Sequence, residues 1–97
     1  MKKAVLIVQD HEGSTWTHTI AEAETLIGRG AASDVRVGDK AISRDHAAIS
    51  WERDHYVVED LQTTNGTRLN GRRVRNGPLE DGDQIQVGKT LITFKYA

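Results

Sequence analysis

The stretch that decides the fold is AVLIVQDHEGSTWTHTI, residues 4–20. It begins with the apolar run Ala4 to Val8 and ends, over residues 15–20, with threonines alternating with Trp, His and Ile. This alternation is the period-2 signature of a strand that has one polar face. The polar segment Asp10 to Ser14 lies between the two, so we expect a pair of strands joined by a turn.

The rest of the chain continues as short apolar runs separated by turn residues. The one helix-compatible stretch, residues 21–24, is too short to stand as a helix. Many short strands with glycines in the turns indicate an all-β sandwich or barrel. Further strands are expected at residues 25–27, 35–37, 46–51, 55–59, 66–69, 72–74, 84–87 and 90–96, and core or sheet-face positions at Trp16, Trp51, Leu69, Ile85 and Phe94.

Composition excludes several classes of function. The 97 residues are expected to form a single domain, 1–97, large enough to fold without disulfides or metals. With 13 basic and 14 acidic residues the net charge is -1, so the chain offers no overall basic field for nucleic acid or for a membrane surface. The apolar run of residues 4–8 is far too short for a signal core or a membrane span. The chain has no cysteine, which fits a reducing compartment, and we expect the cytoplasm.

Three short segments carry groups that suit a bound anion. They are Gly28-Arg29, then residues 43–46 (Ser-Arg-Asp-His), and then residues 63–67 (Thr-Thr-Asn-Gly-Thr). A phosphate is held by a forked guanidinium, by hydroxyl groups and by free backbone N–H groups, and these segments supply all three. Each segment lies next to an expected strand, so we expect the three on loops of the sandwich.

The order and spacing of these motifs resemble the forkhead-associated (FHA) domain, a phosphothreonine-binding β-sandwich. The resemblance covers about three quarters of the chain and implies a two-sheet antiparallel sandwich of about ten or eleven strands, with the binding loops at one end. The matching motifs are Ile27-Gly28-Arg29, Ser33 to Val37, Ile42 to Ala47, Asp60-Leu61, Thr64 to Thr67, Leu69-Asn70-Gly71 and Leu79 to Ile85.

The resemblance also implies roles for individual residues. Arg29, Ser43 and Arg44 would bind the phosphate, and a second cation suits a group that carries roughly -1.5 to -2 charge at neutral pH. Thr64 would help to bind the phosphothreonine, and Asn65 would bond the peptide main chain, because an amide both donates and accepts. Three further residues, Gly28, His46 and Gly66, would support the shape of the site.

Taken singly, each of these residues has a simpler structural explanation. Arg29 suits a solvated surface, and the Ser43 hydroxyl suits a turn in which it bonds its own backbone. Asn65-Gly66 is also an ordinary tight-turn pair, a role compatible with presenting the amide. The ordered combination, rather than any one residue, favours a phosphopeptide site.

Other classes of function fit less well. Ser43 and His46 lie close in sequence without a nucleophile elbow, so we expect no enzyme. The four histidines show no ligand-pair spacing, so we expect no metal and no cofactor. The Arg68 to Arg75 cluster lacks interleaved aromatic residues, so we expect no nucleic-acid binding; it fits a solvated hairpin or a rim that attracts an acidic peptide.

The prediction is therefore a monomeric adaptor module that reads phosphothreonine in a partner protein and makes association depend on an upstream Ser/Thr kinase. The alternative is an FHA-like sandwich that binds an unphosphorylated partner through a sheet face.

Overall fold

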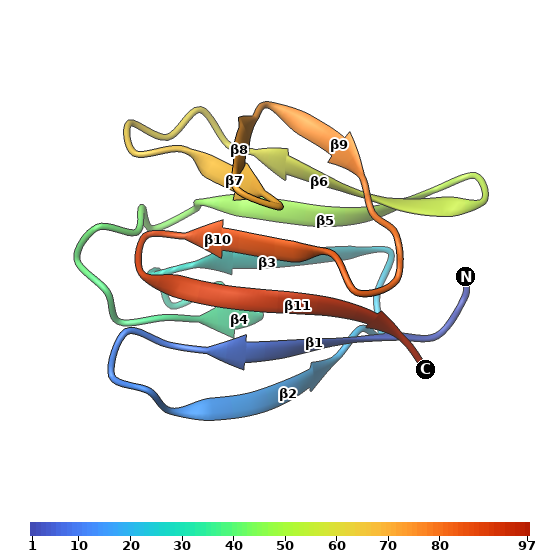
Figure 1. Ribbon diagram of the computed structural model, residues 1–97, viewed down its shortest axis with the longest axis horizontal. Coiled ribbons are helices and arrows are strands. Elements are labelled where there is room, and N and C mark those ends of the chain that lie inside the picture. Colours follow the sequence, from blue (N-terminus) through green and yellow to red (C-terminus); the bar gives the residue numbers. More distant parts are fainter.

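The computed structural model describes residues 1–97 as eleven strands in two packed layers, without a helix (Figure 1). It therefore contains no helix able to cross a membrane. An all-β sandwich was predicted, and this is confirmed. The strands are β1 (Ala4–Gln9), β2 (Thr15–Thr19), β3 (Glu24–Gly28), β4 (Val35–Arg36), β5 (Ala47–Glu52), β6 (His55–Asp60), β7 (Thr67–Leu69), β8 (Arg72–Val74), β9 (Asn76–Pro78), β10 (Gln84–Val87) and β11 (Thr90–Tyr96).

The first layer is a six-stranded sheet in the order β2-β1-β11-β10-β7-β8. The expected pairing of β1 with β2 is confirmed, with Val8 opposite Trp16 and Gln9 opposite Thr15. Alternate β1 side chains, Ala4, Leu6 and Val8, are fully buried. The continuous apolar run at residues 4–8 therefore reads as a strand whose every second side chain enters the core.

The second layer is a five-stranded sheet in the order β4-β3-β5-β6-β9. Two features differ from the prediction. Strands β3 and β4 are parallel, with Ile27 opposite Val35, so this one pair departs from the antiparallel arrangement that was expected of the sandwich. Strand β9 was not expected, because it holds the proline Pro78; it is an edge strand, where a residue without an N–H is tolerated.

The core lies between the layers and is formed by side chains from both sheets. Seventeen buried hydrophobic residues form one cluster, including Ile85 and Phe94, while Trp16, Trp51 and Leu69 pack against it, as predicted. Tyr56 lies in this cluster, with its ring centroid 4.8 Å from that of Trp51 and 5.4 Å from that of Phe94. Its hydroxyl donates to the Lys2 carbonyl at 2.6 Å, so its one polar atom is satisfied.

The sandwich has two distinct ends (Figure 1). Strands β1 and β11 are antiparallel neighbours, with Ala4 opposite Tyr96, so the two termini lie together at one end. The loops β3–β4 (residues 29–34), β4–β5 (37–46) and β6–β7 (61–66) lie at the other end. These loops contain most of the predicted site.

Candidate functional site

Backbone hydrogen bonds join the β3–β4 loop directly to the β4–β5 loop. The Arg29 N–H donates to the Ser43 carbonyl and the Gly30 N–H donates to the Arg44 carbonyl, both at 3.0 Å. The two loops therefore form one backbone unit, although Arg29 and Ser43 are far apart in sequence. Arg29, Ser43 and Arg44, all predicted phosphate contacts, belong to this unit.

Gly28 permits this close approach. A Cβ atom at Gly28 would overlap the Arg44 carbonyl oxygen and would lie 3.0 Å from the Ser33 hydroxyl. Ser33 in turn donates to the same Arg44 carbonyl at 3.3 Å. Glycine at position 28 is thus required by the distance between the two loops rather than by an unusual backbone angle.

The three predicted phosphate-binding side chains have polar groups without protein partners. Arg29 is exposed and its Nε donates to the Ile42 carbonyl at 3.0 Å, which orients the guanidinium while both terminal NH₂ groups make no hydrogen bond. The half-buried Ser43 hydroxyl and the exposed Arg44 guanidinium form no hydrogen bond within the chain. This arrangement can hold an anion, because oriented donors remain available on a fixed backbone.

His46 links the β4–β5 loop to the β6–β7 loop from inside the protein. The side chain is fully buried. Its Nδ1 accepts from the Ser43 N–H at 3.0 Å, so Nε2 carries the proton and donates to the Gly66 carbonyl at 2.8 Å. His46 therefore fixes the backbone of Ser43 relative to Gly66, and its engaged ring is not placed as a base for the Ser43 hydroxyl.

The start of the β6–β7 loop is built around the Asp60 carboxylate. It accepts hydrogen bonds from the Thr63 N–H at 3.0 Å and from the Thr63 and Thr67 hydroxyls at 2.7 Å. The Thr63 hydroxyl also accepts from the Gly66 N–H at 2.9 Å. Burial of Asp60 opposes its ionisation, but the hydrogen bonds from Thr63 and Thr67 outweigh it and lower the pKa of the carboxyl.

Thr64 and Asn65, the predicted peptide contacts, are exposed at the tip of this loop. The Asn65 amide donates to the Ala41 carbonyl at 2.9 Å, a second link to the β4–β5 loop. Its carboxamide oxygen and the Thr64 hydroxyl have no partner in the chain. Gly66 follows with a φ of 83°, in the left-handed region where glycine is favoured.

The β4–β5 loop is also anchored to the β10–β11 turn. The buried Asp39 carboxylate accepts from the Ala41 N–H and from the Lys89 N–H, both at 2.9 Å. The Lys89 N–H, followed by the Ala41 N–H, lowers the pKa of Asp39. The loop that carries Ser43 is therefore held on several sides.

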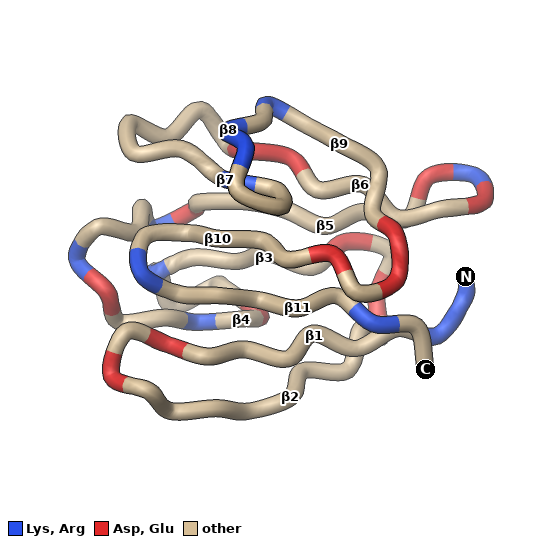
Figure 2. Tube along the Cα trace, in the orientation of Figure 1, with Lys and Arg blue, Asp and Glu red and all other residues tan.

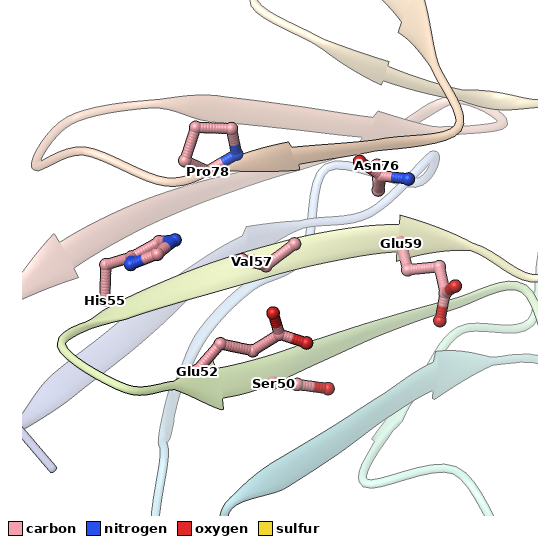
Figure 3. A pocket seen from close by; sticks show the side chains of 7 residues that line it. All are labelled: Ser50, Glu52, His55, Val57, Glu59, Asn76 and Pro78. Carbon is pink, nitrogen blue, oxygen red and sulfur yellow. The ribbon is translucent and has the colours of Figure 1, made fainter.

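Two surface hollows are present, and neither is lined by the predicted site residues. The first, about 390 Å³, lies on the outer face of β5, β6 and β9 and contains none of the predicted site residues (Figure 3). The second, about 760 Å³, lies beside the β6–β7 loop, and its walls include Asp60, Thr63 and Arg73. Basic residues lie along β7 and β8 near this loop, whereas the β5–β6 hairpin at the opposite end carries Glu52 and Asp54 with Arg53 between them (Figure 2).

The sequence predicted no supporting role in the site for Asp39, Asp60 or Arg73, although Asp60 lies in a matching motif and Arg73 in the arginine cluster read as a solvated hairpin or rim. The spacing of Asp60 and Thr63 is a usable signal, because a carboxylate often bonds the N–H group a few residues later in a turn. Arg73 donates to the carbonyl of Thr64 at 3.1 Å from a different strand. Asp39 and Lys89 are 50 residues apart in sequence, so neither the Asp39 contact nor the Arg73 contact can be recognised from a local sequence pattern.

Comparison with known proteins agrees with this geometry. Residues 25–88 match the model of the FHA domain. The chain belongs to the FHA domain family. It is 36% identical over 88 residues to the FHA domain-containing protein FhaA of Mycobacterium tuberculosis, and 32% identical over 91 residues to the glycogen accumulation regulator GarA of the same species. These matches cover 91% and 94% of the chain, but only 17% of FhaA and 56% of GarA.

Solved structures of FHA domains share the fold of this one. A structure described in work on phosphothreonine-dependent FHA domain interactions aligns with a TM-score of 0.87 and 33% identity, covering 98% of this chain and 97% of that one. The FHA domain of FhaA, complexed with the intracellular domain of Rv3910, aligns with a TM-score of 0.84 and 34% identity, covering 95% and 99%.

Proposed function

We propose that this FHA domain is a phosphopeptide-binding adaptor module that recognises phosphothreonine in a partner protein. Association would then depend on an upstream Ser/Thr kinase. The observation that carries the proposal is the set of unpaired donors on Arg29, Ser43 and Arg44, held on loops whose backbones are bonded together. The module has a binding role and no catalytic one.

In this proposal the phosphate binds between the β3–β4 and β4–β5 loops. The two terminal NH₂ groups of Arg29 grip its oxygens in a fork that lysine cannot reproduce. Ser43 donates its hydroxyl, and Arg44 adds a second positive charge, which suits a group of roughly -1.5 to -2 charge.

The β6–β7 loop binds the rest of the phosphothreonine and its main chain. Thr64 lies against the phosphothreonine residue. Asn65 uses its carboxamide oxygen to accept from a peptide N–H, while its NH₂ group keeps the bond to Ala41. Gly28, His46 and Gly66 hold the three loops in this arrangement. The phosphothreonine dependence described for a similar FHA structure supports the choice of threonine.

The direct test first selects a ligand from a degenerate phosphothreonine peptide library and then titrates phosphothreonine, phosphoserine and unmodified versions of it. We expect tight binding of the phosphothreonine form only. Arg29→Ala should weaken it about tenfold or more, because hydrogen bonds to charged groups contribute roughly 1.5–3 kcal/mol each. Arg72→Ala removes an exposed β8 arginine without a hydrogen bond and serves as the matched control.

Ser43→Ala should weaken binding by a similar or smaller factor, and Asn65→Ala should weaken it without unfolding the domain. Equal affinity for the unmodified peptide would refute the proposal and favour phosphate-independent binding through a sheet face.

A further inference from the structure

We propose that Arg73, on β8, is a positioning residue that holds the β6–β7 loop in the conformation that binds the phosphothreonine. The inference rests on the proposed function of that loop. Arg73 Nη2 donates to the Thr64 carbonyl at 3.1 Å and lies 3.5 Å from the Thr63 carbonyl. One guanidinium thus spans the two residues that lead into the exposed tip of the loop.

The same guanidinium lies against Gly66. A Cβ atom at position 66 would overlap Arg73 Nε and would come within 3.0 Å of its Cδ. Glycine at position 66 therefore serves two purposes, because it adopts the φ of 83° and leaves room for the arginine. Arg73 contacts the loop on both sides of Asn65.

Arg73 and Asp60 hold the loop through different atoms. Asp60 binds the N–H and hydroxyl groups of Thr63 at the start of the loop, whereas Arg73 binds carbonyl oxygens. Asp60 belongs to the five-stranded sheet and Arg73 to the six-stranded sheet. A loop held from both sheets loses less conformational freedom when the peptide binds, so its affinity is higher.

Neighbouring arginines do not share this role. Arg68 Nη1 is 3.4 Å from the Gly71 carbonyl, within its own hairpin. Arg72 is exposed and makes no hydrogen bond, and its Cα partner in the sheet is Leu69 rather than a loop residue. Arg72 carries the same charge on the same strand, so it controls for long-range attraction to the phosphate.

The first experiment measures phosphothreonine peptide affinity for Arg73→Ala, Arg73→Gln, Arg73→Lys and Arg72→Ala. We expect Arg73→Ala and Arg73→Gln to weaken binding about fivefold to twentyfold, which is less than the full loss of a direct hydrogen bond to the charged ligand, because Arg73 acts through the loop. Arg73→Lys should recover part of the loss, because one ammonium can still reach a carbonyl. An affinity of Arg73→Ala equal to that of Arg72→Ala would overturn the proposal.

A double-mutant cycle separates positioning of the loop from a general structural effect. If Arg73 acts through the β6–β7 loop, the loss caused by Arg73→Ala should shrink in an Asn65→Ala background. The loss should stay the same in a Ser43→Ala background, because Arg73 bonds Thr63 and Thr64 and the Ser43 hydroxyl has no hydrogen bond to the β6–β7 loop. Equal coupling to both residues would mean that Arg73 supports the whole domain, which contradicts the proposal.

A measurement without peptide keeps this inference separate from the proposed function. Backbone amide resonances of residues 63–66 should shift in Arg73→Ala and stay in place in Arg72→Ala, with Ser43 as an internal reference. Unchanged resonances for residues 63–66 would overturn the positioning role. Failure of the wild-type domain to bind any phosphothreonine peptide would instead refute the proposed function and leave this result standing.

Discussion

The β5–β6 hairpin and the loop end of the sandwich are closed by different kinds of hydrogen bond. At the β5–β6 hairpin, the Asp54 N–H donates to the Glu52 carbonyl and His55 bonds the Asp54 carboxylate, so the partners are one or two residues apart. At the loop end, His46 bonds Gly66 across 20 residues and Asn65 bonds Ala41 across 24. The hairpin is closed locally, whereas the loop end is closed by contacts between separate loops.

This difference has a functional consequence. A local turn can hold only its own few residues, whereas a set of mutually bonded loops can place side chains from three segments around one ligand. At the loop end the backbone N–H groups of Arg29, Gly30 and Ser43 have partners, whereas the terminal NH₂ groups of Arg29 and the side-chain donors of Ser43 and Arg44 do not. Rigid backbone with unpaired side-chain donors is the arrangement that a preorganised anion site requires.

The substitution His46→Ala, at the loop end, should have the largest effect on the stability of the domain. It removes the buried link between two loops, leaves the Ser43 N–H and the Gly66 carbonyl without their partner, and opens a cavity. We expect a loss of about 2–5 kcal/mol in the free energy of unfolding, measured by urea denaturation.

The matching histidine in the local hairpin, His55, is half exposed, and its ring makes a hydrogen bond only to Asp54. Replacement of His55 by alanine should change the free energy of unfolding by no more than about 0.5 kcal/mol. Similar losses for both variants would show that the two ends are held in the same way.

A smaller effect is expected from Gly28→Ala, because the new methyl group clashes with the Arg44 carbonyl and forces the β3–β4 and β4–β5 loops apart. We expect the free energy of unfolding to fall by about 1–3 kcal/mol and phosphopeptide binding to weaken. Gly38→Ala is the control, since a Cβ there has no neighbour within 4 Å. Wild-type stability and affinity in Gly28→Ala would refute this role of Gly28.

The smallest expected effect is on the stability of the domain at acidic pH. The pKa of Asp60 is lowered in the folded state, so its contribution to stability is complete above the unfolded value of about 3.9 and is lost as the pH falls through the folded value. Asp60→Asn should lower the free energy of unfolding by about 1–2 kcal/mol at neutral pH, because the amide accepts fewer hydrogen bonds than the carboxylate. The stability of the Asp60→Asn variant should also fall less steeply than that of the wild type below about pH 4. Parallel pH profiles for variant and wild type would contradict this role.

Much of the fold follows from local patterns. The alternation of residues 15–20 predicted β2 and its pairing with β1, which the structure confirms. Strand β9 was missed because Pro78 signals a turn, and only the sheet order reveals that it lies at an edge. The parallel pairing of β3 with β4 was missed because side-chain alternation carries no information about strand direction.

The candidate site was less accessible to sequence reasoning. Arg29, Ser43 and Asn65 were selected by their order along the chain and by the family resemblance, not by any property of single residues. The bond between Arg73 and the Thr64 carbonyl arises only when β8 is placed beside β7, so no local pattern could indicate it.

The antiparallel pairing of the two terminal strands bears on how the domain responds to tension. A force applied between the two termini acts first on the hydrogen bond from the Ala97 N–H to the Lys3 carbonyl and then on successive pairs along β1 and β11, so it opens their hydrogen bonds one after another rather than all at once. The loop end lies farthest from that point (Figure 1). Pulling on the chain would therefore peel apart the terminal strands before the load reached the three bonded loops.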